Sequence, residues 1–220
     1  NEHTLIGNNG LTIEDLASFW QAIAKEFSTF KNIYGYGLMN EPHDLAPETK
    51  WFDMAQASIN AIREVDTNTL IMVGGNDWSS AERWIEQSDT LKFLKDPANN
   101  LAFEAHVYFD KDASGTYKYS YEEEECYPEK GIDRVKPFVE WIKQNKFHGF
   151  IGEYGIPDND PRWNETLDLF LGYLQENGIN GTYWAAGPWW DTYFMAITPK
   201  DGKDRPQMPI IEKYTSTLKK

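Results

Sequence analysis

The chain has 220 residues, 40% of them hydrophobic and 25% charged, which is enough to bury the core of one globular domain or of a large part of a bigger one. Its formal net charge of −14 argues against nucleic acid and against an anionic membrane as partners, whereas a neutral ligand is compatible with it. A single cysteine, Cys126, excludes an internal disulfide framework, and no apolar run approaches the roughly 20 residues of a membrane-spanning helix.

The first half of the chain alternates helical and strand-like segments. Thr12 and Asp15 fit a capping box at the start of a helix whose apolar positions, from Leu16 to Phe27, share one face. In chain order, we predict a helix over 12–27, a strand over 33–39, a helix over 48–65, a strand over 69–73 and a mixed helical and loop stretch over 79–94.

The second half continues the alternation. Asp160 and Pro161 predict the start of a helix with proline at its first position, and Gly178 follows its end. In chain order, we predict a strand over 101–108, an acidic loop over 110–130, a helix over 133–145, a strand over 148–154, a helix from 161, a strand over 179–186 and a helix over 208–218.

Five strands in strict alternation with about six helices indicate an α/β fold with a parallel sheet and crossover helices. A doubly wound sheet could close with five strands, whereas a TIM barrel needs eight. Polar residues follow several strands at their C-terminal ends, as in Asn40 and Glu41, His106 and Tyr108, and Glu153. TIM barrels build their active sites in this way, so we predict one barrel domain, of which residues 1–220 are a part.

Two glutamates stand at such strand ends. Glu41 follows an apolar strand and precedes Pro42, and Glu153 ends the run from Phe150. Each alone could be a surface glutamate, but two carboxylates on different strands of one sheet form a candidate acid/base pair. Glycosidic bond cleavage needs one carboxylic acid to protonate the leaving oxygen and one carboxylate to attack or stabilise the anomeric carbon.

Further polar and aromatic residues could support such a pair. His106 and Tyr108 are two apart on one strand, so they point to the same face, where a phenol could hold a carboxylate in place, although both could also be core residues. Trp184, Trp189 and Trp190 could stack on sugar rings or form a packed aromatic corner.

The run from Asp110 to Gly115 is similar to the start of a calcium-binding loop. Its twelfth position is Tyr121 instead of the bidentate glutamate that the site needs, so we interpret it as an ordered turn and expect no metal ion and no cofactor.

Taken together, these motifs resemble glycoside hydrolase family 5, the cellulase family. Gly37-Leu38-Met39-Asn40-Glu41-Pro42-His43 resembles its fourth strand. The family's sixth, seventh and eighth strands have similar segments here, at Glu104 to Asp110, Ile151 to Gly155 and Thr182 to Trp190. The resemblance implies a secreted, retaining endo-β-1,4-glucanase. It also leaves open a related enzyme acting on mannan or xyloglucan, or a barrel fragment that binds glycans without cleaving them.

The resemblance also implies roles for individual residues. Glu41 would be the acid/base and Glu153 the nucleophile, with the carboxyl groups about 5–5.5 Å apart. Asn40 would bind the sugar 2-hydroxyl, His106 and Tyr108 would support the carboxylates, and Trp184 would form the floor of the −1 subsite. We expect substrate contacts from Trp189, Trp190, His43 and Trp78 as well. The family's first three strands have no counterpart here, so we expect an N-terminal barrel segment, or a second copy of the chain, to complete the barrel.

Overall fold

The structure, a computed structural model, describes residues 6, 10–45 and 50–215, which form two compact units. The first unit comprises residues 1–105 with 141–149, and the second comprises 106–140 with 150–220. The strands form a sheet in the order β1-β2-β3-β4-β5, and the pairs within the units, β1-β2, β2-β3 and β4-β5, are parallel. The predicted parallel sheet with crossover helices is therefore confirmed.

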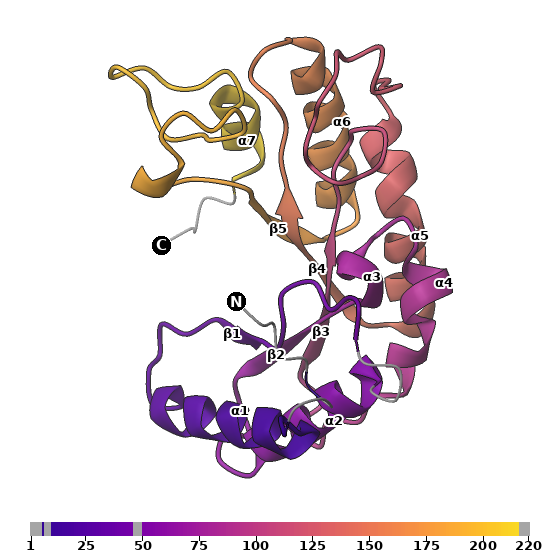
Figure 1. Cartoon of the computed structure of the whole chain (residues 1–220), viewed down its shortest axis with the longest axis vertical. Coiled ribbons are helices and arrows are strands. Elements are labelled where there is room, and N and C mark those ends of the chain that lie inside the picture. The colour runs from indigo at the N-terminus through magenta and orange to yellow at the C-terminus, as the bar shows by residue number, and fades with distance from the viewer. Residues whose placement is uncertain (1–5, 7–9, 46–49, 216–220) are drawn as a thin grey trace. The chain divides into compact units, whose positions relative to one another are not determined.

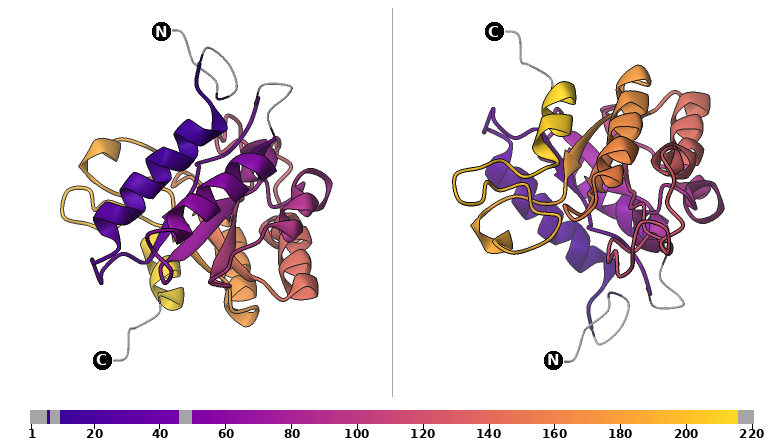
Figure 2. Two further views of the ribbon diagram at one scale, coloured as in Figure 1. Left: turned by 90° about the horizontal axis from the view of Figure 1, so that it is seen from below. Right: turned by 90° about the horizontal axis from the view of Figure 1, so that it is seen from above.

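The first unit places two helices on one face of its strands. Helices α1 and α2 lie side by side below β1 and β2 in Figure 1, and Figure 2 shows the same pairing. Its elements are α1 (Ile13–Phe27), β1 (Gly35–Gly37), α2 (Trp51–Arg63), β2 (Leu70–Gly74), α3 (Asn76–Ser79), α4 (Trp84–Ser88), the 3-10 helix η1 (Asp89–Phe93) and β3 (Leu101–His106), whose last residue belongs to the second unit.

Aromatic side chains fill the core of the first unit. Trp84 and Phe103 lie edge-on to Trp141, with ring centroids 5.5 and 4.9 Å away, and Phe147 closes the cluster. Trp51 is buried on α2 and donates its indole N–H to the carbonyl oxygen of Gly74, at 2.7 Å. These helical tryptophans act in packing.

Helix α1 is packed less completely than its apolar face predicts. The capping box of Thr12 and Asp15 is present, but Ala24 is the one buried residue of the helix. Phe19 and Phe27 are 56% and 37% exposed. The amphipathic pattern therefore predicted the helix correctly but not a cover for its outer apolar residues.

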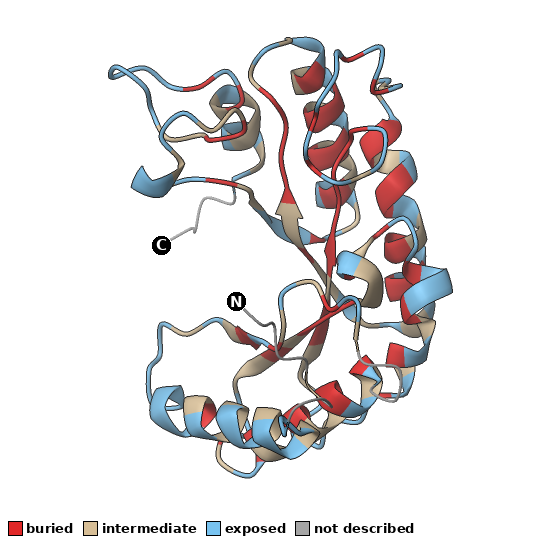
Figure 3. Cartoon of the chain, viewed as in Figure 1, coloured by how far each residue is buried: buried red, intermediate tan, exposed pale blue. Residues whose placement is uncertain are grey.

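The second unit packs its helices against β4 and β5. Its elements are α5 (Lys130–Asn145), which ends in the first unit, β4 (His148–Tyr154), α6 (Arg162–Glu176), β5 (Asn180–Tyr183), the 3-10 helix η2 (Pro188–Trp190) and α7 (Met208–Tyr214). Phe170 of α6 contacts Phe109 and Tyr154, and Trp163 contacts Tyr117 and Tyr121. Buried residues recur along α6 in Figure 3.

Several predicted boundaries are wrong by a few residues. Strands predicted over 33–39, 101–108 and 179–186 end earlier, at Gly37, His106 and Tyr183, although one further backbone N–H after each end still donates to the neighbouring strand. Residues 48–49 of the helix predicted over 48–65, and 216–218 of the last helix, lie outside the described residues.

Two helix starts also differ from the prediction. Helix α5 begins at Lys130, not at 133, and the buried ammonium group of Lys130 donates to the carbonyl oxygens of Glu124 and Glu125, which holds the added turn. Pro161 occupies the N-cap of α6 instead of its first position, and the Asp160 carboxylate accepts from the Arg162 N–H at 2.9 Å. Among the described residues, no helix has the length and apolar character needed to cross a membrane.

Candidate active site

The segment that follows β1 is held from two sides. The Leu38 N–H donates to the carbonyl oxygen of Met72 on β2, at 3.1 Å, and the indole N–H of Trp20 donates to the carbonyl oxygen of Leu38, also at 3.1 Å. Asn40 is exposed and Glu41 is half-buried. Glu41 has a φ of 45°, a left-handed conformation that costs a non-glycine residue about 1–3 kcal/mol and that clusters at functional sites.

Gly74, at the end of β2, lets this segment approach closely. A Cβ atom there would lie 3.1 Å from the carbonyl oxygen of Met39 and 3.5 Å from Cδ of Pro42. The side chain of Trp51 fixes the Gly74 carbonyl from the helix side. The ends of β1 and β2 are therefore packed against each other in a way that a larger residue would disrupt.

His43 and Trp78 form a stacked pair in the first unit. Their ring centroids are 4.4 Å apart and their planes differ by 14°. Trp78 is 42% exposed and stands between Asp77 and Ser79, and all three have φ of 55°. The pair borders a cavity of about 470 Å³. The structure thus brings together two residues that the sequence predicted separately for substrate binding.

The second unit places two predicted side chains, those of Tyr108 and His106, beside the carboxylate of Glu153. The Tyr108 hydroxyl donates to Oε2 of Glu153 at 2.8 Å, and Nδ1 of His106 lies 3.7 Å from the same oxygen. The Val107 N–H donates to the carbonyl oxygen of Glu153, so both segments lie side by side. Tyr154, next along β4, packs on α6, so Glu153 points to the opposite face of the sheet.

The electrostatics of Tyr108 suit a permanent hydrogen-bond donor. Burial, and then the negative charge of Glu153, raise the pKa of Tyr108 far above its ordinary value. The phenol therefore keeps its proton across the pH range in which proteins work. Glu153 thereby receives a neutral donor that fixes the orientation of one of its two oxygens.

Trp184 and Trp190 form one aromatic cluster at the end of β5, and Trp189 does not join it. The Trp184 N–H donates to the carbonyl oxygen of Tyr154 at 2.9 Å, and the rings of Trp184 and Trp190 are 4.8 Å apart. The peptide bond after Trp184 is cis. Trp189 is 90% exposed.

Sequence reasoning missed two tyrosines of the second unit. Burial raises the pKa of Tyr193, a hydrogen bond with Trp184 lowers it and the charge of Glu153 raises it further. Tyr117 is buried and contacts the backbone after Tyr108 and after Glu153. Both stand in loops, where no periodic pattern signals that a side chain turns inward.

Comparisons with known proteins agree with one another. A family model described as cellulase (glycosyl hydrolase family 5) matches residues 1–189. Endo-beta-1,4-glucanase B of Emericella nidulans is 36% identical over 193 residues, which cover 86% of this chain and 56% of that protein. The probable endo-beta-1,4-glucanase B of Aspergillus kawachii is 34% identical over 206 residues, covering 91% and 59%. The chain thus spans a little over half the length of these relatives.

Solved structures give the same similarity. Pseudomonas stutzeri endoglucanase Cel5A, in complex with cellobiose, superposes with a TM-score of 0.91 and 42% identity over 99% of this chain and 65% of that one. XacCel5A, in complex with cellopentaose, superposes with a TM-score of 0.86 and 38% identity, covering 96% of this chain and 68% of that one.

Proposed function

The chain belongs to glycosyl hydrolase family 5, the cellulase family, and on that premise we propose that it carries both catalytic carboxylates of a retaining endo-β-1,4-glucanase. Its fold is part of the family's (β/α)8 TIM barrel, to which it contributes five later strands. Residues 1–220 are then the C-terminal part of a single catalytic domain. The hydrogen bond between Tyr108 and Glu153 is the observation that carries the proposal.

Glu153 is the proposed nucleophile. Tyr108 holds Oε2, which leaves Oε1 to attack the anomeric carbon and form a covalent glycosyl-enzyme ester. The buried His106 lies beside the same carboxylate, with Nδ1 3.7 Å from Oε2. A fixed direction favours the attack, because the reacting atoms must be about 3–3.5 Å apart and aligned.

Glu41 is the proposed acid/base. It donates its proton to the glycosidic oxygen as the bond to the leaving chain breaks, and then takes a proton from the water that hydrolyses the ester. Asn40, beside it, would bind the 2-hydroxyl of the sugar, where hydrogen bonds that strengthen in the transition state lower the barrier. Trp184 would form the floor under the same sugar.

Flat aromatic surfaces support a β-linked glycan as the substrate class, and among these we propose β-1,4-glucan. Trp190 and the stacked pair of His43 and Trp78 present half-exposed rings of the kind that pack on the apolar faces of sugars. Trp189, with most of its surface exposed, is also proposed to contact the substrate. Relatives crystallised with cellobiose and cellopentaose support an oligosaccharide or polysaccharide glucan as substrate. A polymer cannot enter a cell, so we infer that the enzyme is secreted.

A further barrel segment is the proposed partner of the chain. Within the described residues, β1 pairs with β2 alone, and large apolar side chains near it are exposed: Phe19, Phe27, Phe30 and Tyr34. Such an edge with apolar surface beside it is an incomplete sheet. We infer that a parallel strand and its helix from the same polypeptide cover it, since the curated relatives are longer by more than a third.

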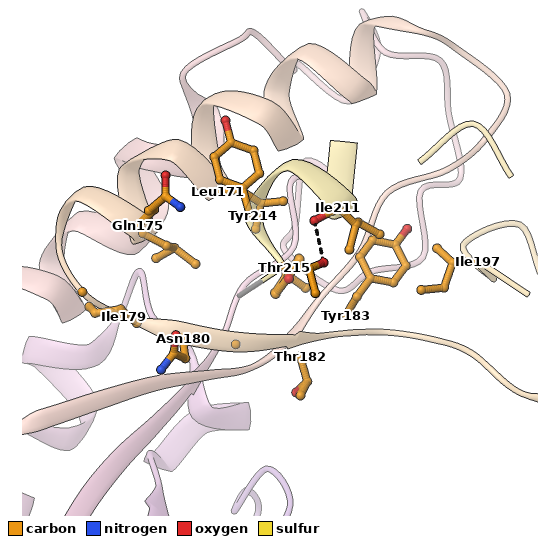
Figure 4. Close-up of a pocket in the computed structure, with 14 residues that line it drawn as sticks. Leu171, Gln175, Ile179, Asn180, Thr182, Tyr183, Ile197, Ile211, Tyr214 and Thr215 are labelled. Atoms are coloured by element: carbon orange, nitrogen blue, oxygen red, sulfur yellow. Dashed lines mark hydrogen bonds between the residues drawn. The ribbon is translucent and has the colours of Figure 1, made fainter. Parts of the chain in front are cut away.

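The second unit has a corresponding surface. At the edge strand β5, a cavity of about 690 Å³ is bordered by Leu171 and Gln175 of α6 and by Ile211 and Tyr214 of α7 (Figure 4). Figure 4 shows these side chains above β5, while Thr182 points to the other side of the strand. The apolar lining suits a strand and helix of the same barrel segment, and catalysis is proposed for the completed barrel.

The test uses the full-length protein that carries this chain. We expect it to release reducing ends from carboxymethyl-cellulose faster than from mannan or xyloglucan, and to give the β anomer first from cellopentaose. Glu41→Ala and Glu153→Ala should each lose activity by about 10³-fold or more, whereas Glu165→Gln, at an exposed site on α6, should not.

Azide rescue on an aryl cellobioside separates the two roles. Azide replaces the missing nucleophile in Glu153→Ala and gives the α-azide, while in Glu41→Ala it replaces water and gives the β-azide. Exchanged products would reverse the assignment, and a first-formed α anomer would refute retention. Faster cleavage of mannan would identify a related β-glycanase, and glycan binding without any product would favour a non-catalytic barrel.

A further inference from the structure

The acidic loop after β3 folds around Asp110. This carboxylate is 1% exposed and accepts hydrogen bonds from four groups, all within seven residues of it. The donors are the Ser114 hydroxyl at 3.1 Å and the backbone N–H groups of Gly115, Thr116 and Tyr117 at 3.0, 3.0 and 3.2 Å. The run that is similar to a calcium loop thus folds back on its own first carboxylate, which accepts from backbone N–H groups of the loop. These hydrogen bonds fix the position of the backbone at Tyr117.

The hydroxyl of Tyr117, which belongs to this loop, lies between two segments that follow strand ends. This hydroxyl donates to the carbonyl oxygen of Gly155 at 2.6 Å and accepts from the N–H of Phe109 at 2.9 Å. Gly155 is two residues after Glu153, and Phe109 directly follows Tyr108. One phenol oxygen therefore joins the backbone that carries Glu153 to the backbone that carries its hydrogen-bond donor.

The same loop also limits the ring of Tyr108. Gly115 has φ of 71°, and a Cβ atom there would lie 3.0 Å from the Tyr108 ring. Arg134 donates to the carbonyl oxygens of Tyr108 and Lys111, so the start of the loop is anchored to α5. The ring of Tyr108 is thus held by the loop and its backbone by α5.

We propose that Tyr117, set in place by the Asp110 loop, is a positioning residue that holds the Tyr108 hydroxyl against Glu153. This inference rests on the proposed function, because it assigns the loop to the nucleophile's side of that reaction. Tyr117 touches neither reacting atom. It fixes the separation of the two strand ends, on which the length of the bond between Tyr108 and Glu153 depends.

The consequence is a defined change in the pH dependence of the reaction. A weaker bond from Tyr108 stabilises the Glu153 carboxylate less, so the acidic limb of kcat/KM moves to higher pH. Within the second unit, the titratable groups that face Glu153 are Tyr108, His106 and Tyr193. The hydroxyls of Tyr108 and Tyr193 stay protonated, because burial raises the pKa of both.

Tyr117→Phe tests the proposal, with Tyr121→Phe as a matched control. Both tyrosines are buried, lie in the same loop and pack on Trp163, with centroid distances of 5.0 and 4.7 Å. The Tyr121 hydroxyl bonds to Thr166 on α6 and not to a strand end. In the full-length protein, we expect Tyr117→Phe to lower kcat about 10-fold with little change in KM, and to move the acidic limb upward by about half a pH unit.

Tyr121→Phe should lose comparable stability in urea and leave the pH profile of the parent unchanged. If Tyr117→Phe keeps the parent profile, or if both variants shift it equally, the loop has only a structural role and the proposal is wrong. Should Tyr117→Phe not fold, Ser114→Ala removes one exposed donor to Asp110 and must give a smaller shift in the same direction. The glucanase activity of the parent protein is measured first. A parent without this activity would refute the proposed function, independently of any variant.

Discussion

Replacing Tyr108 by phenylalanine removes one oxygen atom from the proposed nucleophile site. The lost contact is the 2.8 Å hydrogen bond to Oε2 of Glu153. The ring itself can stay, because it is 7% exposed and packed against the Asp110 loop. The variant therefore tests the hydrogen bond with little change in packing.

The magnitude follows from the charge on the acceptor. A hydrogen bond to a charged group contributes about 1.5–3 kcal/mol, and 1.36 kcal/mol corresponds to one pH unit or to tenfold in rate. Loss of the Tyr108 donor should therefore move the acidic limb of kcat/KM upward by about one pH unit or more. It should also slow the second step by about 10- to 100-fold, because the carboxylate that leaves the glycosyl-enzyme ester loses its donor.

The assay is the pH dependence of kcat/KM on an aryl cellobioside, together with a pre-steady-state burst of released phenol. We expect a larger burst in Tyr108→Phe, since the covalent intermediate accumulates when its hydrolysis is slow. Tyr183→Phe is the control, because its hydroxyl bonds to the backbone of Ile156 at 3.1–3.2 Å and not to a carboxylate. An unchanged acidic limb, with kcat within twofold of the parent, would refute the reasoning.

Three further predictions concern the first unit. Burial acts to raise the pKa of Asp66, but hydrogen bonds from Thr69, Asn68 and Tyr36 outweigh it and lower the pKa to about 2. The pKa of Asp66 in the unfolded chain is near 3.8, so this stabilisation is complete above about pH 4 and is lost as pH falls through 2. Asp66→Asn should therefore lower the free energy of unfolding, measured in urea, by about 1–2 kcal/mol at pH 7 and by progressively less below pH 4. Arg63 and Asp96 form an ion pair at 2.7 Å, with side chains 3% and 2% exposed. Arg63→Met should lower the free energy of unfolding by about 3–5 kcal/mol, and adding Asp96→Asn should recover part of this loss because it removes the unpaired charge. Full additivity of the two changes would contradict this prediction. Trp78→Gly removes a half-exposed ring but relieves the strain of a positive φ, so the free energy of unfolding should change by no more than about 1 kcal/mol. The KM for cellopentaose should rise about 10-fold in this variant, and an unchanged KM would show that the ring does not bind substrate.

Much of the fold could be predicted because its signals are local. The apolar spacing of α1 and α6 and the capping box at Thr12 depend on residues three or four apart, and those helices form where the pattern places them. Strand ends were predicted less well. The segments after β1, β3 and β5 carry apolar residues like the strands themselves, and only tertiary contacts, such as the bond between the Tyr117 hydroxyl and Phe109, decide where pairing stops.

The site could be predicted only where it coincides with a strand end. Tyr108 was predicted from its spacing to His106 and Glu153 from its place at a strand end, and the structure joins the two by a hydrogen bond. Tyr117 and Tyr193 could not be predicted, since their directions depend on loop closure around Asp110 and on the path of the chain after Trp184. The different exposures of Trp189 and Trp190 could not be predicted either, because an aromatic motif does not reveal which of two adjacent rings turns outward.

The distribution of backbone strain argues that the residues after β1 and β2 are kept for their side chains. Glu41 and the three residues Asp77, Trp78 and Ser79 have positive φ, at a cost of about 1–3 kcal/mol each, while a whole domain is stable by only about 5–15 kcal/mol. Glycine would adopt these angles without steric cost, as Gly115 and Gly178 do elsewhere in the chain. A fold selected for stability alone would place glycine at some of these positions. The chain instead places there a carboxylate and a half-exposed indole, which is expected if the proposed acid/base step and substrate binding depend on those two side chains.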